Sequence, residues 1–170
     1  MCCRFLSTSG WESIQFCPWL FVCLYMNDSQ TRTFPGRFDS LADIGGFVCQ
    51  AAEAAGLDER AVYAVQMAVD EACSNIIEHA YGGEGQGTIV CTCQVSDGAL
   101  TVILRDQGRP FDPSGVPEPD LDAELRDRAG GGLGLYFMRQ LMDEVHFVFV
   151  PGSGNVLTMV KRSTARESAE

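Results

Sequence analysis

Along the chain, hydrophobic residues recur at two spacings, and each spacing predicts one kind of element. Residues 31–34 suit a short strand. After a Pro-Gly turn, Asp39 or Ser40 can cap a helix that runs to Gly56, because apolar residues repeat there at helical spacing. We therefore predict a strand and then a helix at the beginning of the regular part of the chain.

A second helix is predicted from Asp58, which can act as its N-cap, to the pair Gly82-Gly83. Between these points apolar side chains recur every three or four residues, which places them on one stripe. The stripe consists of Val62, Val65, Val69, Ala72, Cys73, Ile76, Ile77 and Ala80. Such a helix packs this face against a core.

The spacing changes to two residues at position 88. Residues 88–95 and 100–104 each place alternate apolar side chains on one face. Asp97-Gly98 lies between the two runs and is a typical turn pair of a hairpin. The two runs are therefore predicted to form adjacent antiparallel strands.

The region from Gln107 to Gly130 is rich in proline, glycine and acidic residues and has no sustained periodicity. At about twenty residues it is longer than a passive connection needs to be, which predicts a functional lid. A third helix is expected from Gly132 to Asp143. Two last strands are expected at 145–150 and 155–160, joined by a Pro-Gly-Ser-Gly turn.

Three helices and four or five strands predict an α+β fold. We expect a two-layer sandwich in which a mixed, mostly antiparallel sheet carries three helices on one face. A chain of 170 residues suits one core. The domain is expected to span residues 26–163, and residues 164–170 form a polar tail.

The balance of charges narrows the classes of partner. The chain has 12 basic and 23 acidic side chains and a formal net charge of -11. Binding to nucleic acid or to anionic membranes depends on clustered Lys and Arg, so neither partner is expected. A basic protein or a small molecule is easier to accommodate.

The eight cysteines are unevenly distributed, and four of them lie within the first 25 residues. Of the others, Cys49 and Cys73 lie among apolar neighbours in predicted helices, and Cys91 and Cys93 share one strand face. Buried free thiols in a reducing compartment explain this arrangement and predict a cytoplasmic location. A zinc site is the alternative, although no pair has the two-to-four-residue gap with a matching second pair.

Residues 1–25 do not fit the pattern of the rest of the chain. Their apolar run at 16–25 is only half the length of a membrane span and contains Pro18. A secretory signal would need a basic start and a small-residue cleavage site, and Arg4 is the only basic residue there. The hypothesis is that the native protein starts at Met26 and that residues 1–25 are a non-native or disordered extension.

Polar residues on the second predicted helix are candidates for chemistry. Glu71, Asn75 and His79 are four residues apart and line one face, away from the apolar stripe. An Asn oxygen can ligate Mg²⁺, and a carboxylate one turn earlier can orient a nucleophile. Taken alone, the three residues also describe a solvated polar face.

A second candidate is Asp106-Gln107-Gly108. An acid at the end of an apolar strand can hold a nucleobase by its exocyclic amine, and the glycine lets a flat ring approach the backbone. Taken alone, Asp-x-Gly is also a frequent turn.

A third candidate is the glycine run at residues 130–135, which leads directly into the third helix. Successive glycine amides and a helix N-terminus suit the binding of phosphate. The run is not a Walker A loop, because it lacks Gly-Lys-Ser/Thr, and it does not follow a strand as a dinucleotide-binding fingerprint does. A glycine-rich hinge without a ligand is the alternative.

Taken together and in order, these motifs resemble the GHKL ATPase superfamily and its Bergerat ATP-binding fold. They are EACSNIIEHAY at 71–81, DQGRPFDP at 106–113 and GGGLGL at 130–135, with LMDEV at 141–145 beyond. Within the superfamily the sequence is most similar to the RsbW/SpoIIAB class, bacterial anti-sigma factors that are also serine/threonine protein kinases. The resemblance covers roughly residues 31–161 and leaves residues 1–25 unexplained.

The resemblance implies a role for each motif residue. Asn75 would bind the Mg²⁺ that bridges the ATP phosphates, and Glu71 would be the general base. Asp106 would accept a hydrogen bond from the adenine amine, with Gly108 beside the ring. Arg128 could reach a phosphate, and the phosphate-side hinge of the lid would comprise Gly130, Gly131, Gly132, Leu133 and Gly134.

The resemblance also implies an ATP-dependent serine/threonine protein kinase that acts as an anti-sigma factor. Its substrate would be a STAS-domain antagonist, its second partner a sigma factor, and its assembly a homodimer. A non-kinase module of the same fold, which uses ATP only to set its shape or hydrolyses it without a protein acceptor, is the alternative. The presence of both Glu71 and Asn75 favours the kinase, because a binding module does not need both.

Overall fold

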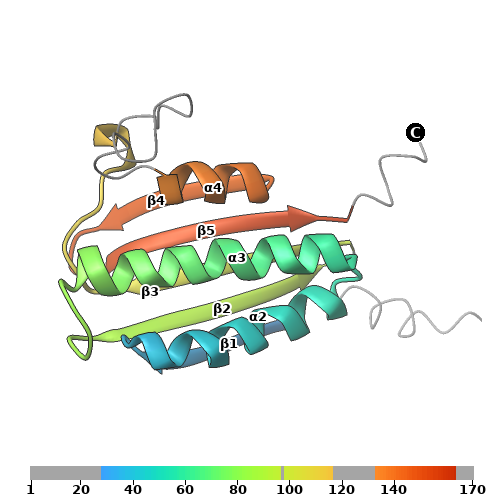
Figure 1. Ribbon diagram of the computed structural model, residues 1–170, viewed down its shortest axis with the longest axis horizontal. Helices are drawn as coiled ribbons and strands as arrows, with labels where there is room; N and C mark the ends of the chain where they lie inside the picture. The colour runs from blue at the N-terminus through green and yellow to red at the C-terminus, as the bar shows by residue number, and fades with distance from the viewer. Residues whose placement is uncertain (1–27, 97, 117–132, 164–170) are drawn as a thin grey trace, which may run out of the picture.

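In the computed structural model, which describes residues 28–96, 98–116 and 133–163, three α-helices cover one face of a five-stranded sheet (Figure 1). The strands are β1 (Asp28–Pro35), β2 (Thr88–Ser96), β3 (Ala99–Asp106), β4 (Glu144–Val150) and β5 (Gly154–Arg162). The helices are α2 (Leu41–Ala54), α3 (Glu59–Asn75) and α4 (Leu133–Leu141), with short helical turns η2 (Phe38–Ser40), η3 (Ile76–Ala80) and η4 (Pro113–Gly115). The predicted two-layer α+β fold is confirmed.

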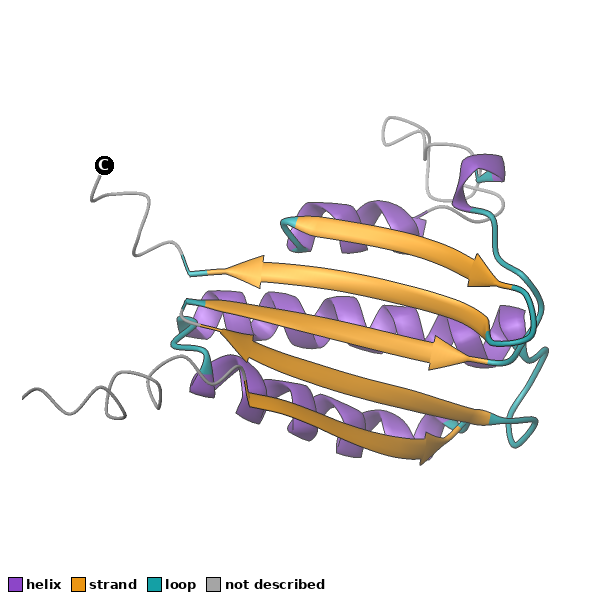
Figure 2. Ribbon diagram, turned by 180° about the vertical axis from the view of Figure 1, so that it is seen from behind, coloured by secondary structure: helices purple, strands orange, loops and turns teal. Residues whose placement is uncertain are grey.

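The strand order is β1-β2-β3-β5-β4 (Figure 2). Every pairing among the described strands is antiparallel, so the sheet has none of the parallel pairs that a mixed sheet would contain. The predicted hairpin of β2 and β3 is present, and Gly98 beside its turn has a φ of 72°. Because β5 runs antiparallel to β3, the first residues of β5 lie against the last residues of β3, with Asn155 opposite Asp106.

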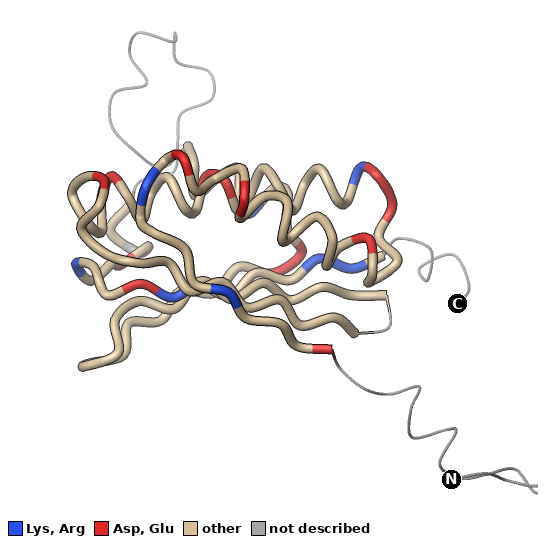
Figure 3. Tube along the Cα trace, turned by 90° about the horizontal axis from the view of Figure 1, so that it is seen from below, with Lys and Arg blue, Asp and Glu red and all other residues tan. Residues whose placement is uncertain are grey.

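The core lies between the helix layer and the sheet, which are seen edge-on in Figure 3. The apolar stripe predicted for the second helix and the inward faces of the strands supply most of it, as period 3.6 and period 2 require. Its most deeply buried side chains include Ile44, Val48, Val65, Val69, Ile77, Ile89, Leu100, Val102, Leu104 and Met159. Exposed acidic residues of the helix layer, such as Asp43, Glu53 and Glu59, face solvent.

The four described cysteines are free thiols; Cys73, Cys91 and Cys93 are buried as predicted, whereas Cys49 is only half-buried. Burial raises the pKa of the Cys73 thiol, so this side chain is protonated and behaves as a small apolar group. Within the described ranges no group of three or more His, Cys, Asp or Glu could hold a metal ion. The zinc alternative therefore finds no support among these residues; the other four cysteines lie outside them.

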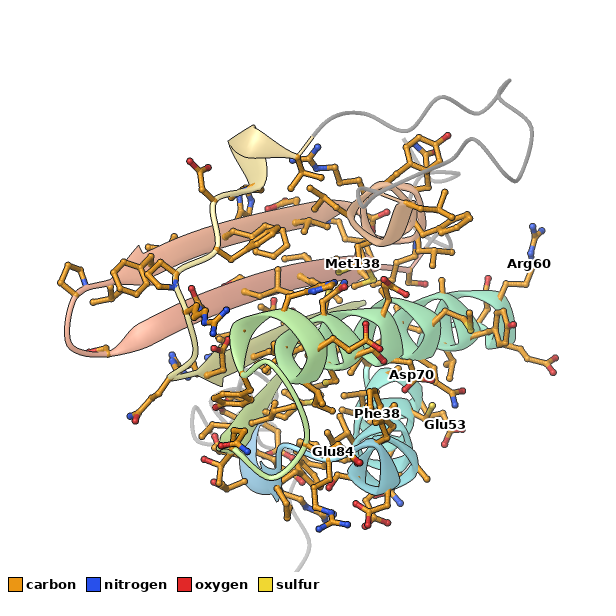
Figure 4. The ribbon with its side chains drawn as sticks, turned by 60° about the vertical axis from the view of Figure 1, so that its left-hand side comes forward. Phe38, Glu53, Arg60, Asp70, Glu84 and Met138 are labelled. Carbon is orange, nitrogen blue, oxygen red and sulfur yellow. The ribbon has the colours of Figure 1, made fainter. Side chains whose placement is uncertain are left out.

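The two long helices begin differently. Asp58 caps α3 as predicted, because its Oδ1 accepts from the amide of Ala61 at 2.8 Å. Ser40 is the N-cap of α2 but makes no side-chain cap bond. The chain entering α2 is instead fixed by Glu84, whose Oε1 accepts from the amide of Phe38 at 2.8 Å (Figure 4).

The end of α3 departs from the sequence prediction of one α-helix up to Gly82. The α-helix ends at Asn75, and residues 76–80 form a π-helical turn, in which the amide of Tyr81 donates to the carbonyl of Ile76 at 2.9 Å. The carbonyl of Ala80, at the end of this turn, has no partner within the helix and accepts from the amide of Arg109 at 2.8 Å. This bond joins the end of the helix to the segment that follows β3.

No helix of the described ranges is both long and apolar enough to cross a membrane.

Candidate functional site

A cavity of about 520 Å³ opens between α3, α4 and the ends of β3, β4 and β5. This volume lies within the range of small-molecule sites, which is about 300 to 1,000 Å³. Polar groups line one part of the cavity, namely Glu71, Asn75, Glu78, His79, Asp106, Arg109 and Asn155. Apolar side chains line the rest, namely Ile76, Pro110, Phe111, Val116, Leu133, Leu135, Met138, Phe147 and Leu157.

Two aromatic rings and a methionine shape the apolar wall. The centroids of Phe111 and Phe147 lie 5.1 Å apart with the rings tilted, a geometry typical of packed aromatic pairs. Met138 is 2 % exposed and lies between α4 and α3 (Figure 4). A flat apolar ligand could pack against this wall.

Asp106 ends β3 and is 5 % exposed, so its carboxylate must be satisfied by the protein or by a ligand. Its Oδ1 accepts from the amide of Gly108 and from Nδ2 of Asn155, each at 2.8 Å. No described residue makes a hydrogen bond to its other oxygen, Oδ2. One carboxylate oxygen is therefore left for a donor in the cavity.

Glu71 and Asn75 lie one helical turn apart near the end of α3, and both line the cavity as their spacing predicts. Nδ2 of Asn75 donates to Oε1 of Glu71 at 3.1 Å. This bond uses the amide nitrogen, so the amide oxygen of Asn75 is left for a cation or a donor. Both side chains are half-buried, which makes them accessible from the cavity.

Gly134, in the first turn of α4, directly faces Glu71. A Cβ built on Gly134 would overlap Oε1 of Glu71 and lie 2.6 Å from its Cδ. The position therefore requires glycine as long as Glu71 keeps its present rotamer. Leu133 precedes it and also lines the cavity.

Gly108 lies beside the cavity but is not part of its lining. A Cβ at this position would lie 2.6 Å from the backbone of Ala80, so the close approach that excludes a side chain is made by the protein. Its amide contributes to the site by holding Asp106.

The structure thus brings Glu71, Asn75, Asp106, Leu133 and Gly134 to one cavity, although the three motifs are far apart in the sequence. His79 also lines it, from the π-helical turn. The expected phosphate-side residues Arg128, Gly130, Gly131 and Gly132, and most of the predicted lid, lie outside the described residues.

Sequence reasoning did not find Asn155. This residue follows the Pro-Gly-Ser-Gly turn and reads as an ordinary first residue of a strand. It becomes part of the site because antiparallel pairing of β3 and β5 places it opposite Asp106. Only the strand order, which periodicity does not determine, could have identified it.

The residues present fit an adenine nucleotide with its Mg²⁺. Oδ2 of the buried Asp106, to which no described residue donates, suits the amine of adenine, and the apolar wall suits the ring. Mg²⁺ is commonly held by one or two protein groups together with substrate phosphates, so the absence of a metal cluster from the described residues is compatible with it.

A family model described as the histidine kinase-like ATPase domain matches residues 34–161. The chain belongs to this family. The match includes α2, α3, α4 and the strands β2, β3 and β4 in full, and every residue of the candidate site. The resemblance stated from the three motifs is thereby confirmed for the ATPase family.

Curated relatives of this histidine kinase-like ATPase carry the name serine-protein kinase RsbW. The protein of Halalkalibacterium halodurans is 37 % identical over 101 residues, which are 57 % of this chain and 60 % of the relative. That of Bacillus velezensis is 40 % identical over 85 residues, 48 % of this chain and 53 % of the relative. That of Listeria innocua is 34 % identical over 113 residues, 63 % of this chain and 71 % of the relative. The similarity thus spans between about half and three-quarters of each relative and identifies the chain as RsbW-like.

A solved structure of the RsbU and RsbW domains of a Mycobacterium tuberculosis protein superposes with a TM-score of 0.56. The alignment covers 79 % of this chain and 32 % of that chain at 16 % identity. It supports the fold alone.

The close approach of Gly134 to Glu71 leads to a test of the site. We expect Gly134→Ala to slow any reaction that uses Glu71 by about tenfold or more, because the new methyl group forces the carboxylate out of its present position. The melting temperature should change little, since the displaced atoms are at the end of a flexible side chain. Nucleotide turnover and thermal unfolding check the two statements.

The matched control for this variant is Gly46→Ala, on the exposed side of α2, where a Cβ would have no neighbour within 4 Å. It should raise stability by roughly 0.5 to 1 kcal/mol, the helix preference of alanine over glycine, without changing turnover. Equal turnover of Gly134→Ala and the wild type would show that the position of Glu71 is not critical.

Proposed function

We propose that this chain binds ATP and Mg²⁺ in the cavity and transfers phosphate to a serine or threonine of a partner protein, as an anti-sigma factor kinase. The observation that carries the proposal is the Glu71–Asn75 pair, hydrogen-bonded at 3.1 Å, on the same cavity as the half-satisfied Asp106. A candidate general base, a candidate ligand for the cation and a candidate acceptor for the adenine amine are thus within one site. Similarity to serine-protein kinases RsbW supports the reaction type.

In this proposal Asp106 selects the base. Its Oδ2 would accept from the exocyclic amine of adenine, since Oδ1 is already used by Gly108 and Asn155. The ring would pack on the apolar wall near Phe111 and Phe147. A base with a carbonyl in place of the amine would face the carboxylate with an acceptor and be rejected.

The phosphates would lie toward Leu133 and Gly134, at the N-terminus of α4, with Asn75 holding Mg²⁺ through its amide oxygen. When bound, Mg²⁺ neutralises charge on the transferring phosphoryl group. Arg128 and Gly130–Gly132 are proposed to complete this side of the site, as the motif resemblance implies.

Glu71 would act as the general base. Its carboxylate is fixed by Asn75 and by the close packing of Gly134. It would accept the proton of an acceptor hydroxyl as that oxygen bonds to the γ-phosphorus and the bond from this phosphorus to the departing ADP breaks. The acceptor must enter from the open side of the cavity, which suits a docked protein.

The partners are proposed by the same resemblance. The acceptor would be a STAS-domain antagonist, the second partner a sigma factor, and the assembly a cytoplasmic homodimer. Residues 26–163 would form the ATP-binding domain and 164–170 a tail. The net charge of -11 is compatible with a partner that has a basic surface.

The test is to incubate the purified protein with Mg-ATP and the STAS protein encoded nearest to its gene. Mass spectrometry should find one added phosphate on a Ser or Thr of that protein. Glu71→Ala, incubated in parallel, should leave the STAS protein unmodified. If ATP binding is measured in the same sample and no STAS protein is phosphorylated, the binding-module alternative becomes the better description.

A further inference from the structure

Asn155 makes three hydrogen bonds at the edge of the cavity. Its Nδ2 donates to Oδ1 of Asp106 at 2.8 Å and to the carbonyl of Arg109 at 2.9 Å. Its Oδ1 accepts from the amide of Phe111 at 3.0 Å. Both amide hydrogens and one lone pair of the amide oxygen are therefore used, and they connect Asn155 to Asp106 and to residues 109–111.

The first of these bonds determines how Asp106 faces the cavity. With Gly108 and Asn155 both donating to Oδ1, rotation of the carboxylate would break two bonds in a group that is 5 % exposed. Oδ2 is thereby kept toward the cavity. Without Asn155 a single donor would remain, and either oxygen could turn toward the ligand.

The other two bonds hold the chain just after β3. They join the carbonyl of Arg109 and the amide of Phe111 to the first residues of β5, and Phe111 is the residue that packs on Phe147. One side chain thus fixes both the base-binding carboxylate and one aromatic wall of the cavity.

We propose that Asn155 is a positioning residue for nucleotide recognition, which acts by fixing Asp106 and residues 109–111 relative to each other. This inference rests on the proposed function, because it assumes that the cavity binds an adenine nucleotide. Asn155 does not itself contact the reacting atoms; its effect on the ligand passes through Asp106 and Phe111.

The decisive variant is Asn155→Asp, which replaces the donor to Asp106 with a second carboxylate of nearly the same shape. Two carboxylates at this distance share a proton, so the pair is compatible with binding at low pH and repulsive at high pH. Relative to the wild type, the affinity of Asn155→Asp for ATP should fall by about tenfold or more between pH 5.5 and pH 8.

Other charged groups face the same cavity, namely Glu71, Glu78, His79 and Arg109. These groups and the nucleotide phosphates are present for both the wild type and the variant. Their contribution to the pH dependence therefore cancels in the ratio of the two affinities. Gln94→Glu is the matched control, because it makes the corresponding change from amide to carboxylate at an exposed position of β2 outside the cavity lining. Its affinity ratio should not change with pH.

A double-mutant cycle provides a second measurement, which does not require Asn155→Asp to fold. Asn155→Ala should weaken ATP binding several-fold at every pH. In the Asp106→Asn background the same substitution should cost less, because only its effect through residues 109–111 remains. Circular dichroism monitors the fold throughout.

A pH-independent ratio for Asn155→Asp, or additive losses in the cycle, would overturn the inference while wild-type binding stands. A wild type that binds no ATP would instead overturn the proposed function, and this inference with it.

Discussion

Asp106→Asn is expected to weaken ATP binding by about 5-fold to 150-fold, the equivalent of roughly 1 to 3 kcal/mol for an unpaired polar contact in a closed site. The structure shows why this near-isosteric change should have so large an effect. The amide of Gly108 and Nδ2 of Asn155 both donate to one side of the carboxylate, so they retain the oxygen of the new amide. The amide nitrogen is then turned toward the cavity, where it meets the adenine amine as donor against donor.

Isothermal titration calorimetry with ATP measures this loss, and circular dichroism confirms that the fold is retained. Asp43→Asn is the control, because it makes the same chemical change on the exposed side of α2. Unchanged affinity of Asp106→Asn, with unchanged circular dichroism, would remove Asp106 from the site.

Glu71→Ala is expected to slow phosphoryl transfer by about 10²-fold to 10⁴-fold, the usual contribution of a general base, and to leave ATP affinity almost unchanged. Asn75→Ala should behave in the opposite way, since its amide oxygen is the proposed ligand of Mg²⁺. It should weaken binding in the presence of Mg²⁺ and have little effect in its absence. The two variants separate catalysis from binding although their side chains are hydrogen-bonded to each other.

Single-turnover transfer to the STAS protein and calorimetry with and without Mg²⁺ make this comparison. Glu53→Ala serves as the control, since it removes an exposed carboxylate from the last turns of α2 (Figure 4). Transfer by Glu71→Ala at the wild-type rate would assign the base to another group.

Much of the fold could be predicted because the sequence contains strong local signals. The apolar stripe around Val65 and Val69 predicted which face of α3 is buried, and Asp58 predicted where this helix begins. Alternating apolar residues at 88–95 predicted strand β2. Each of these signals acts within a few residues and needs no knowledge of the tertiary fold. The same holds for the one-turn spacing of Glu71 and Asn75, which the structure places on one cavity.

Features that depend on tertiary contacts could not be predicted. Asn155 joins the site only because β5 pairs with β3, and the sequence does not encode strand order in any local pattern. The requirement for glycine at positions 108 and 134 likewise comes from close approach to Ala80 and Glu71, which are far away in the chain. The π-helical turn at 76–80 interrupts a periodic pattern that otherwise continues to Ala80.

That turn also limits how the chain can change in length. An α-helical turn would need one residue fewer between Asn75 and Tyr81, and each residue of an α-helix advances the chain by about 100° around its axis. Deleting any single residue from 76–79 would therefore restore regular helical hydrogen bonding, yet turn the carbonyl of Ala80 away from the amide of Arg109. The helix would become regular, but the bond that joins its end to the segment after β3 would be lost, and with it the connection between these two walls of the cavity. An insertion or deletion here would thus damage the cavity even at a position whose side chain is exposed and outside the core, such as Glu78 or His79.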